Sequence, residues 1–246
     1  FAIDAVIEQN CCLGIDIFDI KTQNIKRYFS EATIIATGGA SSVYSRTTNP
    51  SKTTGDGIAI ASRAKIPIAN MEFTQMHPTC FHHPNSPPFV ITEALRGAGA
   101  KLLLPNGQRF MKSYDVRAEL ATRDIVCRAI YSVMMEEKIN YVELDISHED
   151  PLKIKENFPK IFAYCNRFGF DITRDPIPVS PAAHYTCGGI VVNNKGQTKI
   201  PRLYAVGEVS YTGVHGSNRL ASNSLLECVV YARSAAEHIE KLKPSI

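Results

Sequence analysis

Two stretches near the start of the chain alternate between apolar and polar residues. Gly14–Ile20 and Ile25–Phe29 have the two-residue repeat of strands, and the polar Lys-Thr-Gln-Asn between them is typical of a turn. We therefore predict an antiparallel hairpin. The apolar run ATIIAT, at residues 32–37, is typical of a parallel strand buried on both faces. Gly38 and Gly39 end it, either to bring the backbone close to a ligand or as a plain tight turn.

Helical spacing of apolar residues replaces this alternation further along. It predicts a helix after Thr54-Gly55-Asp56-Gly57 and others over residues 117–138, 151–168 and 224–242. Residues 141–146 alternate like a strand, and apolar runs predict further strands at residues 188–193 and 203–208. We interpret PAAHYTCGG, residues 181–189, as a polar turn that leads back into a strand.

Composition narrows the class of protein. A chain of 246 residues, 44% hydrophobic and 21% charged, is typical of one large globular domain or two small ones. The net charge is only +3 and no basic stripe is interleaved with aromatics, so we expect no nucleic-acid partner. No apolar run approaches the roughly 20 residues that cross a bilayer, so we expect no membrane partner.

The cysteines indicate the compartment. There are seven, an odd number without CxxC spacing, which disfavours both a disulfide framework and a structural zinc site. A reducing, cytoplasmic location and the absence of a bound metal are therefore expected.

Four segments place a rare polar residue beside glycine, proline or a turn. They are MHPT with His77, ATRD with Arg123, AAHYTCGG with His184 and HGSNRLASNSLLE with His215 and Arg219. Taken singly, each is more often structural, and Arg123 could form an ordinary surface ion pair with Glu119 or Asp124. As a set, these imidazoles and guanidinium groups predict a dicarboxylate site, because guanidinium groups bind carboxylates through two parallel hydrogen bonds.

Three features are suited to a flavin or nucleotide cofactor. Glu208 ends an apolar strand, where it could bind a ribose or ribityl hydroxyl or be a solvated acid. Asp56 begins a helix, where it could lie beside a phosphate or flavin edge or only interact with the helix dipole. The helix that begins at NSLLE could direct its amides at a flavin carbonyl, or Asn223 could simply cap it.

Several longer stretches resemble the flavoprotein superfamily of succinate dehydrogenase and fumarate reductase. They are ATGG, TGDG, MEFTQMHPT, TEALRGAGA, ATRDIVCRAI, LDISH, PAAHYTCGGI and LYAVGEVSYTGVHGSNRLASNSLLECVVYA. Within that superfamily the chain most resembles the L-aspartate oxidases, because of Cys187 in HYTCGG, SYTG after GEV, and the ending LASNSLLEC. The resemblance covers nearly the whole chain.

The resemblance implies an α/β fold with an α+β insertion. A discontinuous, Rossmann-like FAD-binding domain is expected from residues 1–70 and 186–246, with a capping domain of residues 71–185 between them. Non-covalent FAD is expected on the residues that match the family pattern: Thr37, Gly38, Gly39, Asp56, Glu208, Asn223, Ser224 and Leu225. The family's GxGxxG unit and C-terminal helical domain are not in this sequence, so we expect an internal piece of a longer protein with low FAD occupancy.

The implied activity is FAD-dependent oxidation of L-aspartate to iminoaspartate. The electron acceptor would be O₂, giving H₂O₂, or fumarate, as the first step of NAD biosynthesis through quinolinate, with a functional link to quinolinate synthase. The implied substrate-binding residues are His77, Thr92, Glu93, His184 and Arg219. Arg123 is implied as proton donor or acceptor. Two alternatives stay open: a flavoprotein subunit of fumarate reductase or succinate dehydrogenase, and a folded module without cofactor.

Overall fold

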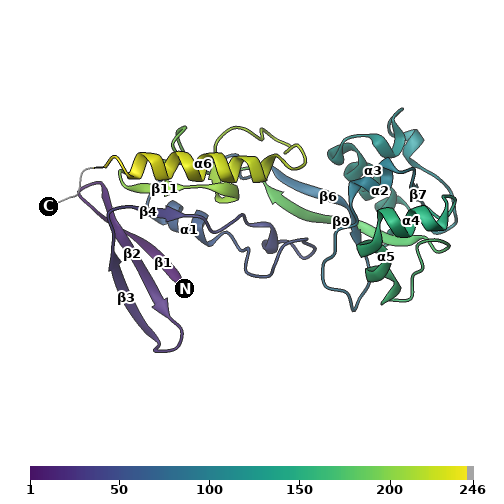
Figure 1. Cartoon of the computed structure of the whole chain (residues 1–246), viewed down its shortest axis with the longest axis horizontal. Helices are drawn as coiled ribbons and strands as arrows, with labels where there is room; N and C mark the ends of the chain where they lie inside the picture. The colour runs from purple at the N-terminus through teal and green to yellow at the C-terminus, as the bar shows by residue number, and fades with distance from the viewer. Residues whose placement is uncertain (243–246) are drawn as a thin grey trace. The chain divides into compact units, whose positions relative to one another are not determined.

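The computed structural model describes residues 1–242, which form a mixed α/β protein (Figure 1). These residues divide into two compact units. The first contains Phe1–Val43, Pro50–Gln75 and the chain from Tyr185 on, and the second contains Tyr44–Asn49 and Met76–His184. Each unit is built around an apolar cluster of its own.

The first unit contains three small sheets. Their strands are β1 (Ala2–Glu8), β2 (Cys11–Asp19) and β3 (Asn24–Phe29); β4 (Thr33–Ile35) and β11 (Leu203–Ala205); and β5 (Ile68–Ala69), β10 (Gly189–Val191) and β12 (Ser210–Tyr211). The predicted hairpin is confirmed, because β2 and β3 pair antiparallel from Gly14 opposite Phe29 to Asp19 opposite Asn24.

Strand β4 pairs in parallel with β11, as its apolar sequence predicts. The prediction that it is buried on both faces is wrong. Ile35 packs in the apolar cluster with Leu203, whereas the side chain of Ile34 is 47% exposed. Because side chains alternate along a strand, Ile34 points away from the cluster that Ile35 joins.

Two helices accompany these sheets. Helix α1 (Asp56–Arg63) follows the TGDG turn as predicted and buries Ile58, Ile60 and Ala61 in the cluster. Helix α6 (Asn223–Ile239) lies against the short 3₁₀ helix η4 (Gly207–Val209), and η1 (Ser41–Val43) is a second 3₁₀ turn. Asn223 is not the cap of α6, which is one of the two roles that the sequence leaves open. It is the first helical residue and follows Ser222, which has left-handed backbone (φ 68°) and makes no side-chain capping bond.

The second unit contains one four-stranded sheet and four α-helices. The strands, in sheet order, are β6 (Thr74–Phe81), β9 (Ile177–Thr186), β8 (Val142–Asp145) and β7 (Lys101–Leu103). The helices are α2 (Glu93–Gly97), α3 (Arg123–Glu136), α4 (Pro151–Asn157) and α5 (Pro159–Asn166), with 3₁₀ turns η2 (Met111–Ser113) and η3 (Ala118–Leu120). Buried Leu95, Leu102, Ile130, Leu144 and Ile177 are part of their shared core.

Two predicted helices are interrupted. Instead of one helix over residues 117–138, η3 is followed by extended backbone at Ala121 and Thr122, and α3 begins only at Arg123. The pattern over 151–168 is two helices, because Pro159 has no amide hydrogen to donate and holds Phe158 outside the helical region (φ −127°).

The interpretation of residues 181–189 as a polar turn is wrong for its first part. Strand β9 continues through Thr186, and the backbone changes course only at the glycines. Backbone hydrogen bonds to a distant segment hold this part of β9. The amide of Thr48 donates to the carbonyl of Ala183 (2.8 Å), and the amide of Ala183 donates to the carbonyl of Arg46 (2.9 Å). Because these partners lie far away in the sequence, local composition could not reveal the strand.

Candidate functional site

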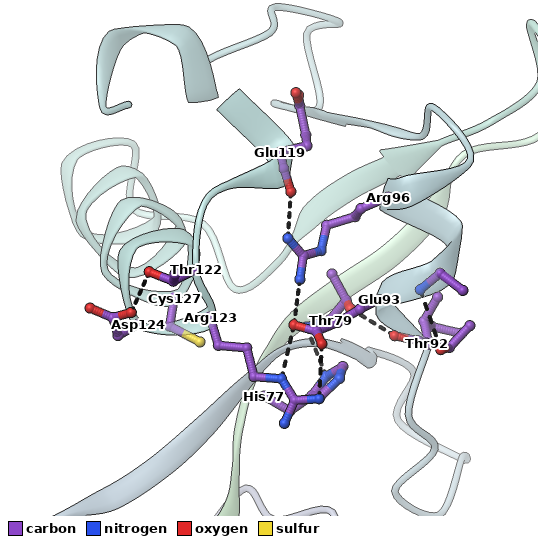
Figure 2. A network of polar contacts seen from close by, with 12 residues as sticks. His77, Thr79, Thr92, Glu93, Arg96, Glu119, Thr122, Arg123, Asp124 and Cys127 are labelled. Carbon is purple, nitrogen blue, oxygen red and sulfur yellow. Dashed lines mark hydrogen bonds and ion pairs between the residues drawn. The ribbon is translucent and has the colours of Figure 1, made fainter. Parts of the chain in front are cut away.

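A guanidinium–carboxylate pair joins the first residues of two helices in the second unit. Arg123 begins α3 and Glu93 begins α2. Arg123 Nε lies 2.8 Å from Glu93 Oε1, and Nη2 donates to Oε2 at 3.0 Å (Figure 2). The Arg123 side chain is only 13% exposed. One hydrogen bond and one short ion-pair contact therefore join the two groups.

A second arginine completes the cluster. Arg96 Nη2 donates to Glu93 Oε1 at 2.9 Å, and Nη1 donates to the carbonyl of Glu119 (Figure 2). Its side chain is 3% exposed, so the Glu93 carboxylate is held between one buried and one nearly buried guanidinium. The predicted surface pair of Arg123 with Glu119 or Asp124 is wrong. Those carboxylates bind Arg109 and Arg128.

The charge of Glu93 follows from these contacts. Burial alone would raise the pKa of its carboxyl group, but the hydrogen bond and charge of Arg123, together with Arg96, outweigh burial and bring the pKa below its ordinary value. Glu93 is therefore an anion at neutral pH, between two cations.

His77 lies beside this cluster on β6 and is buried, with 1% of its surface exposed (Figure 2). Burial holds its pKa well below the ordinary value, and the charges of His184, Arg123 and Arg96 act in the same direction. Its Nδ1 accepts the amide hydrogen of Thr79 at 3.3 Å. A neutral imidazole that accepts at Nδ1 carries its proton on Nε2, so His77 offers one N–H donor.

His184 and Thr92 are the other predicted site residues of this unit. The His184 ring centroid lies 5.2 Å from that of His77, edge to face, and its Nδ1 is 2.7 Å from Thr48 Oγ1. Thr92 caps α2 by accepting the amide hydrogen of Ala94 (3.4 Å). Strands and helix starts thus bring His77, Glu93 and Arg123 together, with His184 next to His77.

In the first unit, the Glu208 carboxylate lies against the backbone of the segment that follows β4. Its Oε1 accepts the amide hydrogen of Thr186 (2.8 Å), and the hydroxyl of Thr186 accepts that of Ala40 (2.9 Å). A Cβ on Gly39 would lie 2.3 Å from Glu208 Oε1, and Gly38 has a φ of 77°. Burial raises the pKa of Glu208. The two glycines therefore permit a close approach of backbone and carboxylate.

The start of α1 approaches the end of β4 just as closely. Gly55 precedes the helix with a φ of 81°, and a Cβ on Gly57 would lie 2.3 Å from Thr37 Oγ1. Asp56 accepts a hydrogen bond from the Thr54 hydroxyl at 2.8 Å. A helix N-terminus reached by glycine backbone suits an electron-rich cofactor group.

Arg219 belongs to another network of the first unit. It is buried, its guanidinium carbon lies 4.5 Å over the ring of Tyr185, and Nη1 donates to Ser224 Oγ at 3.4 Å. Asn223 and Leu225 flank Ser224 at the start of α6, and the Leu225 side chain is 72% exposed.

Two charged residues of these networks had no predicted role. Arg96 stands three residues after Glu93, a helical spacing that could have predicted their pairing. Buried Glu227 accepts from Thr212, from His215 Nε2 (2.8 Å) and from the Tyr185 hydroxyl (3.3 Å). No sequence spacing relates Glu227 to Tyr185, because a strand and a helix from distant parts of the chain bring them together.

Comparison with known proteins decides the family. A model described as an FAD binding domain matches residues 1–225. The chain belongs to this FAD-binding domain family. The predicted α/β flavoprotein fold is therefore confirmed.

Named relatives agree with the predicted resemblance. L-aspartate oxidase 1 of Ralstonia nicotianae is 55% identical over 97% of this chain and 46% of its own length. L-aspartate oxidase of Pseudomonas aeruginosa is 52% identical over 96% of this chain and 45% of its own length. An E. coli quinol fumarate reductase superposes over 100% of this chain and 46% of that chain, with a TM-score of 0.89 and 33% identity. The chain spans slightly less than half the length of these relatives.

The residues present fit the family's cofactor, FAD. A Cβ on Gly39 or Gly57 would overlap side chains such as Glu208 and Thr37, so these glycines let the segment after β4 pack closely on Glu208 and on the start of α1. Glu208 supplies a carboxylate acceptor suited to a cofactor hydroxyl. Within residues 1–242, no three His, Cys, Asp or Glu side chains are placed to hold a metal ion, and each helix is too short or too polar to cross a bilayer.

Proposed function

We propose that the chain is the part of an L-aspartate oxidase that contacts FAD and binds substrate. The proposed reaction oxidises L-aspartate to iminoaspartate. The observation that carries the proposal is the Glu93 carboxylate fixed between Arg96 and Arg123 beside a neutral His77. The identity of 50% or more with several L-aspartate oxidases supports the choice of substrate.

Cofactor contacts are assigned to residues of the first unit. We propose that Glu208, with Thr37, Gly38 and Gly39, binds hydroxyl and phosphate-bearing parts of FAD, and that Asp56, Asn223, Ser224 and Leu225 contribute from the helix starts. When bound, FAD supplies the two-electron acceptor for the amino acid. The predicted boundaries, residues 1–70 and 186–246 for FAD binding and 71–185 for capping, are part of this proposal.

Substrate contacts are assigned mainly to the second unit. His77, with its Nε2–H, together with His184 and Thr92, would donate hydrogen bonds to a carboxylate. The family pattern assigns Arg219 to a substrate carboxylate as well, which its planar guanidinium suits. Glu93 fixes Arg123 and adds a negative charge that suits the substrate ammonium group. Holding both ends of the substrate lowers the entropic cost of reaction.

Arg123 is the proposed catalytic residue. A free guanidinium stays protonated at physiological pH and is a poor base, so its fixed positive charge is at least as important as proton transfer. The salt bridge to Glu93 keeps that charge in one orientation. Release of iminoaspartate links the reaction to quinolinate synthase and NAD biosynthesis, with O₂ or fumarate as electron acceptor.

A chimera tests the substrate assignment. This chain replaces the matching segment of the Ralstonia L-aspartate oxidase 1, and the purified, yellow protein is assayed with L-aspartate for peroxide and with succinate for dye reduction. We expect peroxide from aspartate and negligible dye reduction. The fold similarity to a fumarate reductase supports one alternative, a succinate or fumarate enzyme. An FAD-loaded chimera that oxidises succinate and not aspartate would establish that alternative.

A further inference from the structure

A cavity of about 480 Å³ lies in the second unit, apart from the Arg123 cluster. Its lining includes Ser45, Arg46, Phe81, His82, His83 and Ser180. Sites for small molecules usually have volumes of about 300–1,000 Å³. The cavity is in contact with the end of β6 at Cys80 and Phe81, and its lining includes none of His77, Glu93, Arg96 and Arg123.

Arg46 supplies a positive charge to this cavity. Its backbone carbonyl accepts the amide hydrogen of Ala183 on β9, which fixes the start of the side chain. Nη1 donates to Ser180 Oγ at 2.6 Å and to the carbonyl of Asn140 at 3.1 Å. Both partners are neutral, and no carboxylate among residues 1–242 forms an ion pair with Arg46. Its charge is therefore not neutralised within the described chain.

His82 adds a hydrogen-bond donor next to Arg46. The Ser180 hydroxyl accepts from Arg46, so its own hydrogen is available to His82 Nδ1, which lies 3.4 Å away. Burial lowers the pKa of His82, and the charges of Arg46 and His83 lower it further. The neutral ring then carries its proton on Nε2. Stacking on Tyr141, with ring centroids 5.4 Å apart, fixes the ring plane.

We propose that this cavity binds a small organic anion that joins one carboxylate or phosphate group to an apolar body. The oxyanion would bind Arg46, whose planar group suits both carboxylate and phosphate, and would accept from His82. Phe81, Pro84 and Pro88 provide apolar surface for the rest of the molecule. The inference is independent of the proposed oxidase activity, because it uses none of the residues assigned to FAD or aspartate.

The test is a titration of the whole chain with benzoate, phenyl phosphate and inorganic phosphate, followed through ¹⁵N signals of the histidine side chains. We expect saturable shifts at His82 with benzoate, with phenyl phosphate or with both, and weaker binding of inorganic phosphate, which has no apolar body. The stronger of the two organic probes identifies the preferred oxyanion. Saturating succinate, which would occupy a dicarboxylate site, should leave these shifts in place.

Substitution of Arg46 decides whether the cavity is responsible. Arg46→Gln should weaken binding about tenfold or more, since a hydrogen-bonded charge is lost. Arg46→Lys should bind with intermediate affinity, and it replaces Arg46→Gln as the test if the latter does not fold. Arg174→Gln, at an exposed arginine of the same unit, is the control and should bind like the parent chain. Absence of saturable shifts at His82, or unchanged affinity in both Arg46 variants, would overturn the proposal.

Discussion

Glu93 is the residue on which the cluster of the second unit depends. It is the anion between Arg96 and Arg123, and each arginine would otherwise be a buried or nearly buried cation next to another. Arg123 follows Glu93 by 30 residues, so the sequence offers no spacing from which to predict their contact. The resemblance names both as candidate site residues, but only the fold reveals that they form one pair.

Replacement of Glu93 should destabilise the folded chain. Glu93→Gln should lower the free energy of unfolding at pH 7 by about 2 kcal/mol, because two guanidinium groups lose their common carboxylate. Urea denaturation measures the change. Glu237→Gln, which breaks an exposed arginine pair on α6, is the matched control and should have no measurable effect.

The difference in unfolding free energy between the parent chain and Glu93→Gln should depend on pH in one direction. The folded pKa of Glu93 lies below its ordinary value of 4.5, so its contribution is complete above that pH and is lost as the pH falls further. The stability gap between the parent chain and Glu93→Gln should therefore shrink below pH 4.5. A gap that grew on acidification would contradict the ion-pair account.

His77 should affect stability at a higher pH. Its folded pKa lies below the ordinary 6.5, so unfolding takes up a proton as the pH falls below that value. The parent chain should lose up to about 1.4 kcal/mol per pH unit there through this residue. His77→Gln should flatten the slope by that amount, measured as unfolding free energy against pH. An NMR titration that placed the His77 midpoint at 6.5 would argue against a buried neutral ring.

At the scale of elements, the sequence predicts a helix or strand best where the local residue pattern determines it. Alternation predicts the hairpin of β2 and β3 and strand β8, and a glycine turn before apolar helical spacing predicts helix α1. Prediction fails where distant contacts decide. Backbone bonds from Arg46 and Thr48 hold β9 at Ala183, and extended backbone at Ala121 and Thr122 delays α3 until Arg123. That delay matters, because it makes Arg123 a helix start facing Glu93.

The glycines after β9 set the approach of β10 to its neighbours. A Cβ on Gly188 would lie 2.3 Å from backbone atoms of Asn70, which follows β5 and cannot move without disturbing it. Gly188→Ala should therefore lower the free energy of unfolding by about 2 kcal/mol. Gly97→Ala, where nothing lies within 4 Å, is the control and should be neutral or slightly stabilising. Equal stability of the two variants in thermal unfolding would show that β10 tolerates a wider spacing.

At the scale of the whole molecule, the chain contains two units with separate apolar cores. The family match spans most of both, over residues 1–225. Residues proposed for FAD lie in the first unit, whereas His77, Thr92, Glu93, Arg123 and His184 lie in the second. The sequence could predict the family because long motifs occur in order. It could not predict the internal contacts of each group, which depend on packing between distant segments.

Turnover of the aspartate oxidase chimera with Arg123→Lys tests the central claim most directly. Lysine keeps the charge but lacks the planar guanidinium that contacts both Glu93 oxygens, so peroxide release from L-aspartate should fall by about 100-fold or more at unchanged FAD absorbance. The unsubstituted chimera sets the reference rate. Unchanged turnover and pH profile in the FAD-loaded Arg123→Lys protein would contradict the assignment of Arg123 as the catalytic residue.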